Sequence, residues 1–148
     1  MFIYRRNLTN ILLVGFIALT ACDKLSSDIT KATAVLSGNS EVPPNTSTAT
    51  GKADVAIDIK NDKLSWTITY SGLSGAITGT HFHGPAGSSE NADVVIPIEG
   101  DMLSPIKGET TISNEQKTQL LEGKWYVNLH TAANPDGEIR GQLVIIPK

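Results

Sequence analysis

Three histidines are the side chains of this 148-residue chain best suited to chemistry. His81 and His83 fall in the segment 77–83 and His130 falls in the segment 124–131, and both segments have the composition of β-strands. Side chains two residues apart on a strand point to the same face, so we expect His81 and His83 to lie together. If the sheet joins the two segments, three imidazoles meet beside an open fourth position, which suits zinc or copper. The sequence therefore predicts a candidate copper or zinc site at His81, His83 and His130.

The same histidines also fit a purely structural role. Neutral imidazoles at strand ends hydrogen-bond to backbone and polar neighbours. Here they would fix the rigid turn at residues 84–87, which contains Gly84, Pro85 and Gly87. Both interpretations stay open from the sequence, and they differ in whether the three imidazoles converge.

A second group of polar residues belongs to the C-terminal part of the chain. Glu138 and Arg140 are two residues apart on one predicted strand, and Tyr126 and Asn128 share the strand face of His130. Arg140 can bind a carboxylate or another anion bidentately. Alternatively, Glu138 and Arg140 form a structural ion pair or hydrogen-bond network. This is the favoured role, and it requires partial burial because exposed pairs contribute only about 0–1 kcal/mol. A third role for Glu138 is to orient one of the histidines, as carboxylates do around metal ligands.

Two long motifs carry a resemblance to a known family. The first is His81-Phe82-His83-Gly84-Pro85-Ala86-Gly87, and the second runs from His130-Thr131 through Asn134-Pro135 to Gly137-Glu138-Ile139-Arg140-Gly141. From about Lys31 to Leu143 the chain resembles the CHRD domain, which is named for the BMP antagonist chordin and is also found in many microbial proteins. The resemblance implies a β-barrel or β-sandwich of immunoglobulin or superoxide-dismutase type. It implies no settled biochemical activity.

The chain departs from these relatives at one position. In many family members a cysteine follows the Gly-Glu-Ile-Arg segment, whereas Gly141 stands there in this chain, so a role tied to that cysteine is absent. The dinuclear centre of copper-zinc superoxide dismutase needs more histidines than the three present, and it is therefore excluded. A single copper or zinc ion is not excluded by this count.

The pattern of residues 32–148 predicts one all-β domain. Alternating segments separated by Gly, Pro and Asn predict strands near 33–36, 53–60, 64–71, 77–83, 94–99, 108–112, 124–131 and 138–146. Ser113 and Gln116 have the spacing of a capping box, which predicts one short helix over 114–122. A turn is predicted at residues 134–137, and Gly141 inside the last strand suggests a bulge or a close backbone approach. The expected fold is an antiparallel Greek-key sandwich or barrel with one short helix.

The N-terminal residues predict export and lipidation. Arg5 and Arg6 precede an apolar run at residues 11–19, which is too short to span a bilayer, and Leu19-Thr20-Ala21-Cys22 follows. This pattern predicts a lipoprotein signal peptide at residues 1–21, acylation of Cys22, and a lipidated tether at residues 22–31. Several acyl chains on one residue anchor a protein stably, so we expect attachment to the cell membrane. The domain would face the periplasm or the cell exterior, and Asp23 favours the inner membrane.

The charge of the chain narrows the possible partners. A net charge of −3 and the absence of a basic run disfavour nucleic acid. No pattern of a serine hydrolase, a phosphate loop or a zinc protease is present in the sequence. We therefore expect a binding module for a metal ion or for another extracytoplasmic protein. Two alternatives are an adhesion or assembly domain with structural histidines, and an enzyme with dismutase-like chemistry at one copper ion.

We predict that Cys22→Ser leaves the precursor uncleaved or releases the domain into soluble fractions, because the cysteine thiol is the acceptor of the lipid. Cell fractionation and gel migration measure this directly. A variant that fractionates and migrates like the wild type would rule out the lipoprotein interpretation. Recovery of the native protein in outer-membrane fractions of a density gradient would rule out placement in the inner membrane.

Overall fold

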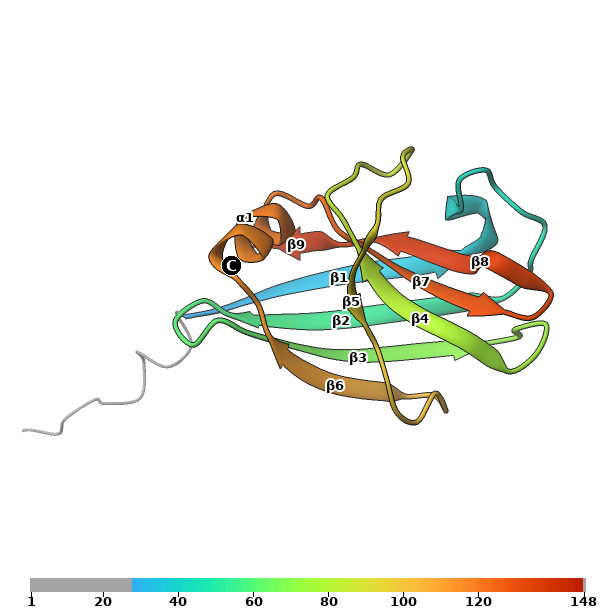
Figure 1. The fold of residues 1–148 in the computed structure, drawn as a ribbon, viewed down its shortest axis with the longest axis horizontal. Helices are drawn as coiled ribbons and strands as arrows, with labels where there is room; N and C mark the ends of the chain where they lie inside the picture. Colours follow the sequence, from blue (N-terminus) through green and yellow to red (C-terminus); the bar gives the residue numbers. More distant parts are fainter. Residues whose placement is uncertain (1–27, 148) are drawn as a thin grey trace, which may run out of the picture.

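The computed structural model describes residues 28–147, so the predicted signal peptide, Cys22 and most of the predicted tether lie outside the described residues. Nine strands and one α-helix follow one another along this part of the chain (Figure 1). A 3-10 turn, η1 (Gly38–Ser40), follows the first strand, and the helix, α1 (Asn114–Leu121), follows the sixth. The strands are β1 (Ile29–Ser37), β2 (Thr50–Asp58), β3 (Lys63–Ser71), β4 (Ile77–His83), β5 (Val94–Pro97), β6 (Ile106–Thr111), β7 (Tyr126–Thr131), β8 (Asn134–Gln142) and β9 (Val144–Ile146).

All of these strands belong to one antiparallel sheet. Its order is β5-β4-β7-β8-β1-β2-β3-β6, and β9 also pairs with β1. β1 therefore joins two halves of the sheet, because it pairs with β8 through Ser37 and Arg140 and with β9 through residues 31–33. The sheet curls into a half-barrel, which Figure 1 shows, as the natural twist of strands favours. This architecture confirms the predicted all-β fold with one short helix.

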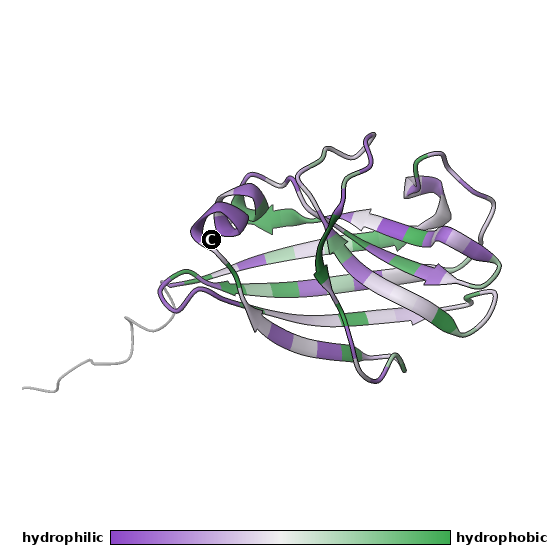
Figure 2. Ribbon diagram, in the orientation of Figure 1, coloured by the Kyte–Doolittle hydropathy of each residue, from purple (hydrophilic) through white to green (hydrophobic). Residues whose placement is uncertain are grey.

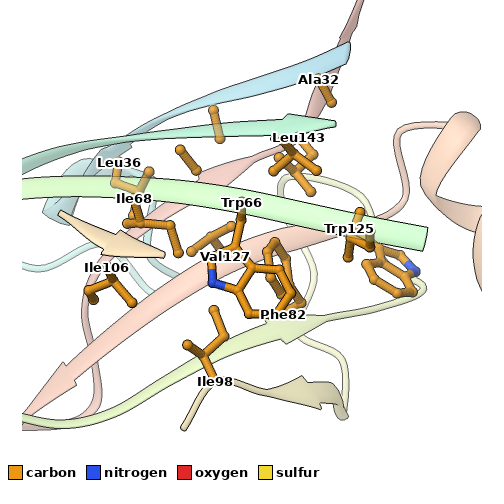
Figure 3. Close-up of a cluster of buried hydrophobic side chains, with 14 of the residues drawn as sticks. Ala32, Leu36, Trp66, Ile68, Phe82, Ile98, Ile106, Trp125, Val127 and Leu143 are labelled. Atoms are coloured by element: carbon orange, nitrogen blue, oxygen red, sulfur yellow. The ribbon is translucent and has the colours of Figure 1, made fainter. Parts of the chain in front are cut away.

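The hydrophobic core lies between the two halves of the curled sheet. Every second side chain along β2 and most of β3 is buried, and the intervening side chains are more exposed. Trp66 of β3 meets Phe82 of β4 across the core, with ring centroids 5.3 Å apart (Figure 3). Fully burying one Leu, Ile, Val or Phe side chain stabilises a fold by roughly 1.5–3 kcal/mol. The core therefore holds the domain together without a disulfide, because Cys22 is the only cysteine of the chain.

Helix α1 forms where the capping-box sequence predicts it. The Ser113 hydroxyl accepts the Gln116 N–H at 3.1 Å, and the Ser113 N–H donates to Gln116 Oε1 at 2.8 Å. Leu120 is the buried side chain of the helix, and Figure 2 shows the rest of α1 as mainly hydrophilic. Within residues 28–147, no helix has the length and apolar character needed to cross a membrane.

The hairpin between β7 and β8 corrects one prediction. The turn lies at residues 132–133, and the predicted turn residues 134–137 instead begin β8. The pairing between Leu129 and Thr131 contains a register shift, which accommodates this earlier turn as a β-bulge. Gly137 has a φ of +131° within the strand, a backbone conformation that glycine adopts more easily than other residues. The Asn-Pro-Asp-Gly composition suggested a turn, but strand pairing with β7 overrides that local preference.

The close approach predicted at Gly141 is confirmed. A Cβ atom at this position would lie 2.5 Å from the Val35 carbonyl oxygen and 2.9 Å from its carbonyl carbon. Gly141 lies next to Arg140, the residue through which β8 pairs with β1. Only glycine allows the backbones of β8 and β1 to come this close at the junction of the two half-sheets.

We predict that Gly141→Ala lowers the free energy of unfolding by about 1–3 kcal/mol or more, because the new methyl group meets rigid backbone atoms and the junction must open. Denaturant unfolding measures the loss. Gly75→Ala is the matched control, since a Cβ there meets no atom within 4 Å, and we expect a change within about 0.5 kcal/mol. Equal stability of both variants would show that the junction is not close-packed.

Candidate metal centre

The three histidines lie on a polar face formed by β4, β7 and β8. Antiparallel register sets His83 opposite Tyr126 and His81 opposite Asn128, and Asn128 is in turn opposite Arg140 on β8. The alternate residues of the same strands point the other way and are buried in the core: Phe82, Val127, Leu129 and Ile139. The sheet thus has one apolar and one polar side in this region, as the sequence alternation of β7 predicts.

The imidazoles converge at one point of the polar face. One nitrogen from each of His81, His83 and His130 lies within 4.8 Å of the other two. His81 Nδ1 and His130 Nε2 are 3.3 Å apart. Gly79, which pairs with His130 across the β4–β7 ladder, makes this approach possible, because a Cβ there would lie 3.0 Å from His81 Cε1. The structure therefore brings together all three predicted ligands.

Backbone carbonyl groups define the tautomers of two of the histidines. His83 Nδ1 lies 3.0 Å from the Ala92 carbonyl oxygen, and His130 Nδ1 lies 2.9 Å from the Pro135 carbonyl oxygen. A carbonyl oxygen only accepts, so each Nδ1 carries the proton and each Nε2 has a free lone pair. His83 Nε2 is buried and has no hydrogen-bond partner among the described residues. A buried nitrogen lone pair that accepts no hydrogen bond is available to coordinate a metal ion.

The surroundings of His81 and His83 favour their neutral forms. Burial lowers the pKa of His81, and the neighbouring His130 and His83 lower it further. Burial also lowers the pKa of His83, against the opposing effect of its bond to the Ala92 carbonyl. A metal ligand must be deprotonated, so lowered histidine pKa values favour metal binding at neutral pH.

Tyr126 positions His83 by two contacts. Its ring stacks on the His83 imidazole, with centroids 4.8 Å apart and an angle of 1° between the planes. Its hydroxyl accepts the Ala92 N–H at 3.1 Å and donates to the Ala92 carbonyl at 3.3 Å, so it also fixes the residue that binds His83. The guanidinium carbon of Arg140 lies 3.4 Å from the centroid of the same ring, a cation–π contact.

Arg140 fastens the loop that follows the histidine strand. Its side chain is 1% exposed and donates to the Gly87 carbonyl, the Glu90 carbonyl and Asn91 Oδ1, at 3.1, 2.7 and 2.9 Å. None of these acceptors is a carboxylate, and no ion pair in the described part of the chain includes Arg140. The guanidinium therefore holds the loop of residues 84–93 through neutral acceptors.

Glu138 lies in a separate hydrogen-bond network. Its fully buried carboxylate accepts hydrogen bonds from the Ser74 N–H and hydroxyl and from the Thr131 and Ser47 hydroxyls, at 2.6–2.9 Å. Burial alone would raise the pKa of Glu138, but these hydrogen bonds outweigh it and lower the pKa to about 2. The acceptors that orient His83 and His130 are backbone carbonyls instead, so Glu138 does not take the histidine-orienting role considered from the sequence.

Several site residues could not be found from the sequence. Ser47 comes from the loop of residues 38–49, which carries no periodic pattern, and Ser74 comes from a bend after β3. The carbonyls of Ala92 and Pro135 belong to backbone, which has no sequence signal at all. Only the fold brings these groups to the polar face.

The spacing of one pair of candidate ligand nitrogens fits a tetrahedral metal ion. Zinc–nitrogen bonds of about 2.0–2.1 Å place two ligand nitrogens of a tetrahedral site about 3.3 Å apart. His81 Nδ1 and His130 Nε2 have this separation already. His81 and His130 are only partly buried, so solvent can reach the cluster. The donor set of three imidazoles suits zinc or copper and not calcium or magnesium, which prefer oxygen.

Comparison with known proteins identifies the family of the domain. The family model of the CHRD domain matches residues 32–143, which include all three histidines, Glu138 and Arg140. No curated protein and no solved structure matches the chain.

We predict that Glu138→Gln lowers the free energy of unfolding at neutral pH by on the order of 3 kcal/mol, because the ionised form holds the buried network together. The folded-state pKa lies below the ordinary value of 4.5, so this stabilisation is complete above about pH 4.5 and is lost as pH falls toward about 2. Denaturant unfolding across this range measures it. The exposed Glu109→Gln is the control. A wild-type advantage that stays constant from neutral pH to about pH 2 would contradict the assignment.

Proposed function

We propose, from the premise that this chain belongs to the CHRD domain family, that its three histidines bind a single zinc or copper ion. The observation that carries the proposal is the unpartnered, buried Nε2 of His83, in a cluster where one nitrogen from each histidine lies within 4.8 Å of the other two. A purely structural histidine would have both nitrogens satisfied. The Nδ1 atoms of His83 and His130 already have their carbonyl partners, which leaves the Nε2 atoms for the metal.

His81 completes the ligand set with little rearrangement. In the metal-free site, its Nδ1–H donates to the bare Nε2 of His130 at 3.3 Å. For His81 to offer Nδ1 to a metal, its proton would have to be carried on Nε2, and the His81 side chain is only partly buried. His81 Nδ1 then supplies the third nitrogen. The ion would sit where the hydrogen bond between the two imidazoles was.

Three protein ligands in a cluster that solvent can reach favour exchange over permanent burial of the metal. Structural zinc sites normally have four protein ligands, whereas sites with three keep the fourth for water or another molecule. With nitrogen ligands, copper binds more tightly than zinc on the general order of affinities. We therefore infer a module that takes up, holds or presents the ion.

The cellular place of this module follows from the N-terminal pattern. We propose that acylated Cys22 anchors the chain to the cell membrane and that the domain faces the periplasm or the cell exterior. The first described strand begins at Ile29, so only a short stretch of chain separates the anchor from the sheet. A metal-binding domain at this place would meet ions before they enter the cell.

We predict stoichiometric binding of zinc and copper to protein without a polyhistidine tag, with a rise in melting temperature. Calorimetric titration measures it. His81→Ala, His83→Ala and His130→Ala should each weaken binding by more than the roughly 10–100-fold that changes around the ligands produce. Binding should also weaken with falling pH, and because the pKa values of His81 and His83 are lowered, this should begin below about pH 6.5.

Asparagine substitutions separate the metal-binding role from a structural one. The Asn side-chain amide reaches the position of His Nδ1, so His83→Asn and His130→Asn retain a donor for the carbonyls of Ala92 and Pro135 but lose Nε2. We expect both variants to keep the melting temperature of the metal-free protein and to lose metal binding. Binding that survives in all the histidine variants, or its absence in the wild type, would refute the proposal and favour the adhesion or assembly role.

A further inference from the structure

Glu41 is a buried acid that takes no part in the histidine cluster. It lies just after η1, in the loop of residues 38–49, and its side chain is 6% exposed. This loop covers part of the polar face of β7 and β8. Asn128, in the middle of that face, is 5% exposed and donates through Nδ2 to Glu41 Oε2 at 3.3 Å.

The remaining oxygen of each of these two groups has no partner. Glu41 Oε1 and Asn128 Oδ1 are both buried and unbonded among the described residues. Both lie 2.7 Å from the point where Gly137 would place a Cβ atom, so they are no more than twice that distance from each other. The α-carbon of Gly137 thus covers the pair directly. Two buried acceptor oxygens within this distance of each other, each without a donor, would be strongly unfavourable.

One proton on Glu41 Oε1 would give both of these oxygens a hydrogen-bond partner. We propose that Glu41 is held as a neutral carboxylic acid and pairs with the Asn128 amide through two hydrogen bonds, which makes this proton a pH-sensitive latch of the loop of residues 38–49. In the first bond, Asn128 Nδ2 donates to Glu41 Oε2. In the second, the protonated Glu41 Oε1 donates to Asn128 Oδ1. This inference goes beyond the proposed metal site and uses none of its ligands.

A metal ion does not explain the two free oxygens as well as a proton does. Calcium takes six to eight oxygen ligands, whereas only two unpartnered oxygens converge here. The guanidinium of Arg140 also acts electrostatically on Glu41, and a nearby positive charge opposes a second cation. A proton on Oε1 satisfies both oxygens and adds no charge to the pair.

The charged and titratable groups around Glu41 explain why its proton is exchangeable near neutral pH. Burial raises the pKa of Glu41 to about 7, although the charge of Arg140 on β8 and the bond from Asn128 on β7 lower it. Asp136, also on β8, lines the same surface cavity of about 280 Å³ as Glu41 and is exposed. From the loop of residues 84–93, the neutral Asn91 side chain donates to the Val42 carbonyl, next to Glu41.

Loss of the proton would weaken the attachment of the loop. Ionised Glu41 would present a charged oxygen to Asn128 Oδ1, which cannot donate. The acid–amide pair must then separate, although the loop is still held farther along by Asn45, whose Nδ2 donates to the carbonyls of Gly137 and Glu138 at 3.1 Å. We therefore expect movement near Glu41 with the base of the loop retained.

The test is a pH titration of the wild-type protein by nuclear magnetic resonance. The carboxyl carbon of Glu41 should titrate with a midpoint near neutral pH, and amide signals of residues 39–43 should shift with the same midpoint. Titration in the ordinary range of glutamate, near about 4.3, would overturn the proposal. So would amide signals that do not follow Glu41.

Glu41→Gln provides the matched variant, because Gln donates permanently from the position of the protonated oxygen. The folded protein binds the Glu41 proton more tightly than the unfolded chain, so the contribution of Glu41 to the melting temperature should fall as pH rises from about 4.5 to about 7. In Glu41→Gln this fall should be absent, and the variant should melt higher than the wild type above neutral pH. The exposed Glu109→Gln should follow the wild type. A Glu41→Gln variant that also follows the wild type would overturn the latch.

Discussion

The polar face of β4, β7 and β8 is buried without being apolar, and this constraint governs much of the structure. Most sheets of this kind bury one face and expose the other to water. Here the two loops at residues 38–49 and 84–93 cover the second face, so its polar groups lose water and must find partners within the protein. Hydrogen bonds and ring contacts within the protein replace water for these groups, as they do at Arg140, Glu138, Tyr126 and Asn128. At Gly79, Gly137 and Gly141, neighbouring atoms lie within 3.0 Å of the place that a Cβ atom would occupy.

Two buried glutamates show how the number of donors decides the charge of a group. Glu138 receives four hydrogen bonds, from Ser47, Ser74 and Thr131, and is stable as an anion although it is fully buried. Glu41 receives one hydrogen bond, from Asn128, and burial raises its pKa to about 7. The nearby guanidinium of Arg140 does not reverse this difference. Four hydrogen bonds therefore outweigh the effect of burial at Glu138, whereas one hydrogen bond and a nearby guanidinium do not outweigh it at Glu41.

The histidine cluster is one part of the polar face that the described residues do not satisfy by themselves. Arg140 has three acceptors and Glu138 has its four donors, whereas His83 Nε2 has none among the described residues. The surroundings of His83 are nevertheless well defined, because Tyr126 stacks on its ring and binds Ala92, which orients it. A rigid setting around an unsatisfied lone pair is a preorganised ligand, and preorganisation reduces what a metal must rearrange on binding.

The sequence by itself determined most of the strands, the helix and which strand residues share a face. The one strand predicted over 138–146 is instead divided into β8 and β9, and β9 pairs with β1. Period-two alternation predicts β2 and β3, the capping box predicts α1, and the spacing of His81 and His83 places them on one side of a strand, because these features depend on neighbours in the chain. The turn predicted at residues 134–137 was wrong because pairing with β7 overrode local propensity. The tertiary structure alone decided that His130 meets His81, that carbonyls rather than Glu138 orient the histidines, and that Glu41 reaches Asn128. These contacts depend on register between strands and on the path of loops, which no pattern along the chain specifies.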